Sequence, residues 1–161
     1  MDKAFRVIGI DPGSLKTGYG IIDVKKNHFE LVDHGVIKLK GDFNDRIKKI
    51  YKELRVVLLR AKPDVFSIER VFVSKNVDSA LKLGHARAAA ICACADLDLS
   101  VFEYSPKEIK KAVSGSGNAD KNQVMRMVSI ILNTRNALSS DDADALAIAI
   151  CHANHAQNII G

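Results

Sequence analysis

Apolar runs separated by polar turns divide the first part of the chain into three predicted strands. The run from Phe5 to Asp11 is almost continuously apolar, which is typical of a strand buried on both faces. Two further strands are expected from Gly18 to Val24 and from Phe29 to Leu39, and the polar residues 25–27 turn the chain between them. Consecutive strands joined by short turns predict an antiparallel three-stranded meander.

Beyond this meander the pattern changes to helical periods interrupted by two more strands. Apolar residues recur at spacings of three and four between Asn44 and Ala61, and Pro63 ends this amphipathic helix. Strands are expected from Val65 to Val71 and from Leu99 to Tyr104. The capping box Ser105-Pro106-Lys107-Glu108 predicts the start of a helix that ends near residue 113. The remaining helices are expected at residues 78–96, 121–132 and 141–155.

This order of elements predicts an α/β fold with a mixed five-stranded sheet and helices on both faces. We expect one domain that spans residues 1–161, because the chain shows no repeat, linker or shift in composition. Crossovers between parallel strands are right-handed, and the first and fourth strands are most simply parallel neighbours. Asp11 and Glu69 would then meet at the carboxyl ends of two adjacent strands, the usual ligand edge of such a sheet.

Four carboxylates stand in apolar surroundings that give them no obvious structural role. Asp11 ends the first apolar run, Glu69 interrupts the run from Val65 to Val71, and Asp141 and Asp144 open an apolar helix one turn apart. Ionised carboxylates leave water only when they are paired, hydrogen-bonded or bound to a metal. Oxygen ligands without clustered histidine or cysteine favour Mg²⁺ or Mn²⁺ over Zn²⁺. The pattern therefore predicts metal-dependent phosphodiester chemistry at these four acids.

Simpler interpretations exist for single residues of this set. Asp11, which precedes Pro12 and Gly13, would equally suit an Asx turn. On the last helix Ser139 and Asp142 have the spacing of a capping pair, so Asp142 is the acid expected to be structural. Asp144 lies beyond the first turn of this helix, where the helix dipole no longer explains a negative charge.

Basic side chains are predicted to follow a phosphate backbone. The net charge is +5 and the pI about 9.1, which favours a polyanionic partner. Phe72, three residues after Glu69, would either cap the core or stack on a base. A merely solvated face is the alternative for the lysines that we expect to contact phosphates, which are Lys75, Lys107, Lys110, Lys111 and Lys121.

Cysteine usage and hydropathy point to the cytoplasm. Cys92, Cys94 and Cys151 are an odd number in apolar, alanine-rich surroundings and are expected to be reduced core residues. No apolar run is long enough to span a membrane, and no leader sequence is predicted.

Four sequence blocks resemble the RuvC family of Holliday-junction resolvases, in order and over nearly the whole chain. The first hairpin contains Ile8-Gly9-Ile10-Asp11-Pro12-Gly13-Ser14 and then Thr17-Gly18-Tyr19-Gly20. The later blocks are Ile68-Glu69-Arg70-Val71-Phe72 followed by Ser79-Ala80-Leu81-Lys82-Leu83-Gly84, then Phe102-Glu103-Tyr104, and finally Asp141-Asp142-Ala143-Asp144-Ala145-Leu146-Ala147.

This resemblance implies a ribonuclease-H-like fold and a homodimer that makes paired cuts in opposed strands of a four-way DNA junction, in recombination and repair. It implies Mg²⁺, with two ions about 4 Å apart in each active site. Asp11, Glu69, Asp141 and Asp144 match the catalytic acids of the family. Phe72 matches the aromatic residue at the junction, and Lys110 and Lys121 match DNA-contacting lysines. The family also works with a branch-migration complex of a junction-binding tetramer and a hexameric motor.

Other functions remain open at this level. The first hairpin also resembles the phosphate loop of actin-like ATPases and sugar kinases, but 161 residues leave no room for the second lobe that they need. A nuclease for RNA–DNA hybrids would use the same acids. A non-catalytic junction-binding protein should have lost at least one of them, whereas all four are present.

Overall fold

The computed structural model describes residues 4–26, 28–72 and 75–160, and within these ranges five strands form one mixed sheet. The strands run in the spatial order β3-β2-β1-β4-β5. The first three form the predicted antiparallel meander, and β4 and β5 extend it in parallel beside β1. Their bounds are β1 (Phe5–Asp11), β2 (Lys16–Lys25), β3 (His28–Lys38), β4 (Val65–Glu69) and β5 (Ser100–Tyr104).

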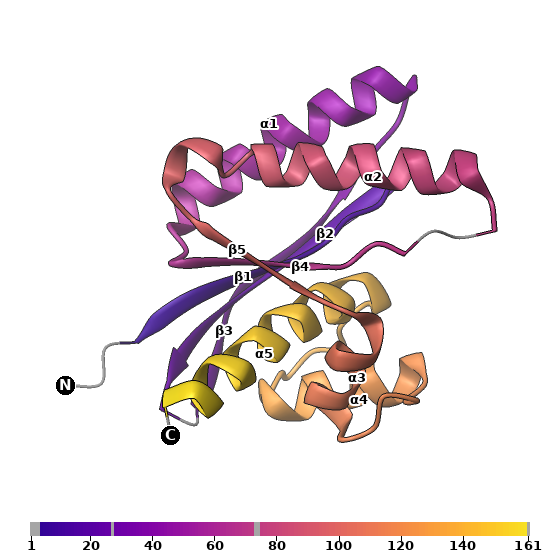
Figure 1. The fold of residues 1–161 in the computed structure, drawn as a ribbon. Coiled ribbons are helices and arrows are strands. Elements are labelled where there is room, and N and C mark those ends of the chain that lie inside the picture. The colour runs from indigo at the N-terminus through magenta and orange to yellow at the C-terminus, as the bar shows by residue number, and fades with distance from the viewer. Residues whose placement is uncertain (1–3, 27, 73–74, 161) are drawn as a thin grey trace.

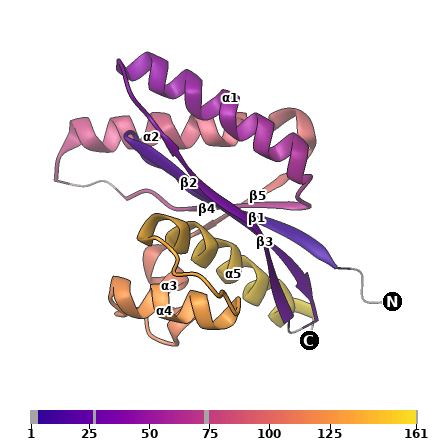
Figure 2. The same ribbon diagram turned by 180° about the vertical axis from the view of Figure 1, so that it is seen from behind.

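Helices cover both faces of this sheet, as predicted (Figures 1 and 2). Helices α1 and α2 lie on one face, and α5 crosses the other face with α3 and α4 beyond it. The bounds are α1 (Phe43–Ala61), α2 (Val77–Cys92), α3 (Pro106–Ser114), α4 (Lys121–Ile131) and α5 (Ser140–Ile160), with a short 3₁₀ helix, η1 (Ala95–Leu97), after α2.

The two layers produce two hydrophobic clusters, one on each face of the sheet. Alternate residues of β1 point to opposite faces, so Val7 joins the cluster under α5 and Ile8 joins the cluster under α1 and α2. Both clusters pack on the same sheet, which is compatible with one domain over residues 1–161, although that extent stays a prediction.

Several element ends differ from the sequence-based expectation. Strand β4 stops at Glu69 rather than Val71, because its register with β5 ends at the Glu69 and Tyr104 pair. Helix α2 stops at Cys92 rather than Asp96. The chain then passes through η1, and Asp98, which follows η1, has a left-handed backbone conformation. Strand β2 begins at Lys16, where it still pairs with β3.

The cysteine prediction is correct for two residues and wrong for the third. Cys94 and Cys151 are buried, whereas Cys92 is exposed at the end of α2, so it is not a core residue. All three are free thiols. None of the helices in the described ranges has the length and hydropathy needed to cross a bilayer.

Glycines in the first hairpin let α5 lie directly on the sheet. A Cβ atom placed on Gly9 would lie 2.2 Å from the carbonyl oxygen of Ala145 and 2.6 Å from the backbone nitrogen of Ala149. A Cβ on Gly20 would lie 2.7 Å from the side chain of Leu146. The helix backbone is thus in contact with the strands, and no larger residue fits between them.

We predict that Gly9→Ala strongly destabilises the protein. The obstructing atoms belong to the helix backbone, so α5 must shift as a whole, and such overpacking costs about 1–3 kcal/mol or more. Thermal unfolding followed by circular dichroism measures the loss. Gly117→Ala is the matched control, because its nearest contact would be an ordinary 3.4 Å, and it should melt close to wild type. Equal melting temperatures for the two variants would refute the close contact.

Candidate active site

Two neighbouring parallel strands bring Asp11 and Glu69 to the same edge of the sheet. The register of β1 with β4 pairs Ile10 with Ile68, so Asp11 and Glu69 are the next residues on adjacent strands. This is the predicted arrangement, and it places both carboxylates at the carboxyl ends of their strands.

Helix α5 adds the other two acids from the opposite layer. Its first turn lies on the hairpin, where a Cβ on Gly18 would be 3.1 Å from the carbonyl oxygen of Asp141 and 3.8 Å from Cβ of Asp11. Asp144 follows Asp141 by three residues and so lies one helical turn further along the same side.

A cavity of about 270 Å³ forms where these elements meet. Its acidic lining comes from Asp11, Glu69 and Asp144, and its basic lining comes from Lys110 and Lys121. Apolar side chains complete the wall, namely Pro106, Ile109, Val124, Ala147 and Ile148. The cavity therefore places three carboxylates and two ammonium groups around one space.

Asp141 lies beside this cavity rather than in its lining. Its Oδ2 atom accepts a hydrogen bond from Nζ of Lys16 at 2.7 Å. This bond, together with the charges of Asp141 and the other acids, raises the pKa of Lys16. Lys16 escaped the sequence analysis because the second strand was expected to start at Gly18, which left Lys16 in the turn. Only its pairing with β3, which places Lys16 on the second strand, would have indicated this residue.

The nearby lysines only partly neutralise the acids in the cavity. Burial, and then repulsion by Glu69, Asp144 and Asp141, raises the pKa of Asp11 to about 7. Burial and Asp144 raise the pKa of Glu69. Burial also raises the pKa of Asp144, and Lys121 opposes this rise. Ionised oxygens with too few counter-charges form the donor set that a hard divalent cation prefers.

The fit to a metal rests on this chemistry and not on a preformed cage. In residues 4–26, 28–72 and 75–160, no three His, Cys, Asp or Glu side chains already have the spacing of a metal site. Asp11, Glu69 and Asp144 line the cavity and Asp141 lies beside it, so these four carboxylates would hold a divalent ion after their side chains adjusted.

Asp142 forms the predicted capping pair with Ser139. Its backbone N–H donates to Oγ of Ser139 at 3.2 Å, and the Ser139 hydroxyl donates to its carboxylate. Nδ1 of His34 lies 3.0 Å from Oδ1, outside good hydrogen-bonding geometry. Burial would raise the pKa of Asp142, but Ser139 and His34 outweigh it and lower that pKa. The choice of Asp141 over Asp142 as a ligand stays a prediction.

The predicted DNA-contacting residues divide into two groups. Lys110 and Lys121 line the cavity, whereas Lys107 and Lys111 are exposed on α3 outside it, and Lys75 is exposed before α2. Phe72 is 59% exposed, so it does not cap the core.

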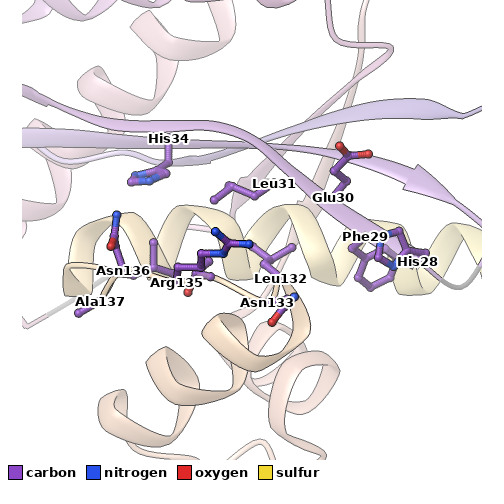
Figure 3. A pocket seen from close by; sticks show the side chains of 12 residues that line it. His28, Phe29, Glu30, Leu31, His34, Leu132, Asn133, Arg135, Asn136 and Ala137 are labelled. Carbon is purple, nitrogen blue, oxygen red and sulfur yellow. The ribbon is translucent and has the colours of Figure 1, made fainter.

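A larger groove lies elsewhere and contains none of the four acids. It has a volume of about 650 Å³ and runs between β3 and residues 132–138, with His34 and Arg135 among its lining (Figure 3). Its side chains include no cluster of carboxylates. A choice of site by cavity size alone would therefore select this groove and miss the acids.

We predict that Asp11→Asn raises the melting temperature of the metal-free protein. A folded-state pKa of about 7, well above the ordinary pKa of an aspartate, means that the folded protein binds the Asp11 proton more tightly than the unfolded chain does. Wild-type stability therefore falls as the pH rises from about 4 through 7, and the carboxylate penalty is complete above that range. The variant should gain a few degrees at pH 8 and less at pH 5, because about 1 kcal/mol changes the melting temperature by roughly 2–4 °C.

Thermal melts in EDTA at both pH values test this prediction. Asp78→Asn is the control, because the Asp78 carboxylate is 73% exposed and pairs with Lys82 at 2.9 Å. The change in melting temperature that Asp78→Asn causes should not grow with pH. A lower melting temperature for Asp11→Asn at pH 8 would contradict the repulsion within the acid cluster.

Comparison with known proteins identifies the family. The family model described as crossover junction endodeoxyribonuclease RuvC matches residues 7–152. The chain is 50% identical over 155 residues to the RuvC proteins of Pseudoalteromonas translucida and Dichelobacter nodosus, covering 96% of this chain and 89% and 88% of theirs.

Solved structures agree with the sequence relatives. Thermus thermophilus RuvC in complex with a Holliday junction substrate matches with a TM-score of 0.90 at 34% identity over 96% of both chains. This match confirms the predicted ribonuclease-H-like fold. The yeast mitochondrial resolvase Ydc2, with a TM-score of 0.65 and 14% identity, shares the fold alone. With a family model and half-identical relatives that cover nearly its whole length, this chain belongs to the RuvC family of crossover junction endodeoxyribonucleases.

Proposed function

We propose that this protein resolves four-way DNA junctions by hydrolysing one phosphodiester in each of two opposed strands, with Asp11, Glu69, Asp141 and Asp144 as the catalytic acids. The observation that carries the proposal is the convergence of Asp11, Glu69 and Asp144 from β1, β4 and α5 on a cavity that two lysines also line, with Asp141 beside it. Family membership makes junction DNA the expected substrate, since the relatives are crossover junction endodeoxyribonucleases.

The acids are proposed to hold two Mg²⁺ ions, with Mn²⁺ as a substitute. When bound, such ions supply a water nucleophile at neutral pH and stabilise the leaving 3′-oxygen. Asp11 is affected electrostatically by the other three acids, so it is the central residue of the set. Hard cations would also remove the repulsion that now raises its pKa.

The basic residues are proposed to place the substrate. Lys110 and Lys121 face the acids across the cavity, where their ammonium groups would bind the phosphates beside the cut. Lys75, Lys107 and Lys111 are exposed further out and would contact the backbone of the junction arms. Their contribution should depend on salt, as expected of phosphate contacts.

A homodimer is proposed because one active site cuts one strand. Paired cuts need two sites, and twofold symmetry places them on opposed strands. Helix α2 offers an interface, since Val77 and Leu81 are 65% and 58% exposed and the small residues Gly84 and Ala88 are exposed further along the helix. Cooperation with a branch-migration complex of a tetramer and a hexameric motor belongs to the same proposal and rests on the family resemblance.

Neutralising each proposed ligand should abolish cleavage without abolishing junction binding. The changes are Asp11→Asn, Glu69→Gln, Asp141→Asn and Asp144→Asn, each of which removes ligand charge and leaves the basic surface intact. Cleavage is measured on labelled four-way junction, duplex and RNA–DNA hybrid in Mg²⁺, with the cuts mapped on all strands. Binding is measured by gel shift in EDTA.

Asp142→Asn is the matched control on the same helix turn and should cut nearly normally. An inactive Asp142→Asn together with an active Asp141→Asn would show that the ligand on α5 is misassigned. If wild type cut the RNA–DNA hybrid preferentially, the hybrid would replace the four-way junction as the proposed substrate.

Phe72 is proposed to stack on an unpaired base at the crossover. Because it is 59% exposed, Phe72→Ala should melt within a few degrees of wild type. It should cut intact junctions poorly, because base stacking is worth about 1–3 kcal/mol. Junctions with unpaired bases at the crossover should recover part of the rate.

Phe66→Ala is the contrasting variant, because Phe66 is fully buried and its truncation should cost about 3–5 kcal/mol of stability. Equal cleavage defects of Phe72→Ala on paired and unpaired junctions would argue against stacking.

A further inference from the structure

Lys16 forms an ion pair with Asp141, one of the four carboxylates that are proposed to bind a metal. Its ammonium lies 2.7 Å from Oδ2 of Asp141 and also interacts with the charges of Asp11 and Asp144. Lys16 comes from the start of β2, and Asp141 from the start of α5, so the contact joins the hairpin to the helix.

The surroundings of Lys16 indicate that this contact is specific. Its cross-strand partner is Lys38, and two like charges directly opposite each other on neighbouring strands repel. The acid cluster offsets this repulsion for Lys16. Lys110 and Lys121 line the cavity, whereas Lys16 pairs with Asp141 beside it. Among the described residues, Asp141 forms its ion pair with Lys16.

We propose that Lys16 is a resident counter-ion, which stabilises the acid cluster in the metal-free protein and competes with a divalent cation for Asp141. The inference rests on the proposed metal site and adds a residue that competes with the metal for it. The short hydrogen bond uses one lone pair of the Asp141 carboxylate, and the ammonium repels an incoming dication, so both effects weaken metal binding at this residue.

Exposure of Lys16 makes this exchange easy. Its side chain is 58% exposed, so the ammonium can move into water without crossing the core. Exposed ion pairs are weak, and the competition should therefore change metal affinity moderately rather than prevent binding. Lys16 would thus set the metal concentration at which the site fills.

Metal titration of charge variants tests the proposal directly. The experiment measures Mn²⁺ binding by isothermal titration calorimetry at low salt and without DNA, so that no cleavage contributes. Lys16→Met should bind Mn²⁺ about three- to tenfold more tightly than wild type. Lys16→Arg, which keeps the charge, should remain close to wild type. Lys38→Met removes the same charge from the adjacent strand and should change the affinity by less than about twofold.

Thermal stability gives a second and independent readout. In EDTA, Lys16→Met should melt below wild type, because the acids lose their counter-ion, whereas Lys38→Met should not. Saturating Mn²⁺ should remove the difference between Lys16→Met and wild type. In an Asp141→Asn background, Lys16→Met should no longer change Mn²⁺ affinity, since the partner of the lysine is absent.

The outcomes separate this inference from the proposed function. Saturable Mn²⁺ binding with equal affinities for Lys16→Met and Lys38→Met would overturn the role of Lys16 and leave the metal site standing. A persistent effect of Lys16→Met in the Asp141→Asn background would also overturn it. If wild type bound no Mn²⁺, the metal site itself would fail, and the inference with it.

Discussion

Direct backbone contact between α5 and the first hairpin is the constraint on which the site depends. Gly9 and Gly20 have no side chains to hold the helix away, so its backbone lies on β1 and β2. The first turn of α5 consequently comes down beside Asp11, as the short distance from Gly18 to the Asp141 carbonyl shows. With a helix one side-chain layer further out, Asp144 would not reach the cavity that Asp11 and Glu69 line.

The same contact creates an electrostatic problem that the nearby lysines only partly relieve. Helix α5 brings Asp144 into a half-buried space with Asp11, where both carboxylates lose water and repel each other. Lys121 opposes the rise in the pKa of both acids, and Lys16 pairs with Asp141 beside the cavity. Residual negative charge is thus built into the fold, and such a charge excess favours binding of cations over stability of the empty site.

Local sequence patterns predicted most of this arrangement, but not the partners of each side chain. Period and turn chemistry placed β1 and the helix capped by Ser105, and acids in apolar runs marked Glu69. Whether Phe72 faces the core or water depends on where the chain leaves β4, which no local pattern encodes. The contact between Lys16 and Asp141 spans 125 positions, so only the packing of α5 on the hairpin reveals it.

Arg87 connects helix α2 to the strand end that carries Glu69. Arg87 of α2 donates from Nε to the backbone carbonyl of Glu69 at 3.5 Å and also pairs with Glu103 of β5. The helix that presents Val77 and Leu81 to a proposed partner is therefore tied to the strand end that carries a proposed metal ligand. A shift of α2 at the interface would move this arginine against Glu69. In the proposed twofold dimer, the single shared interface would then influence the position of this acid in both active sites, which suits an enzyme that must cut two strands together.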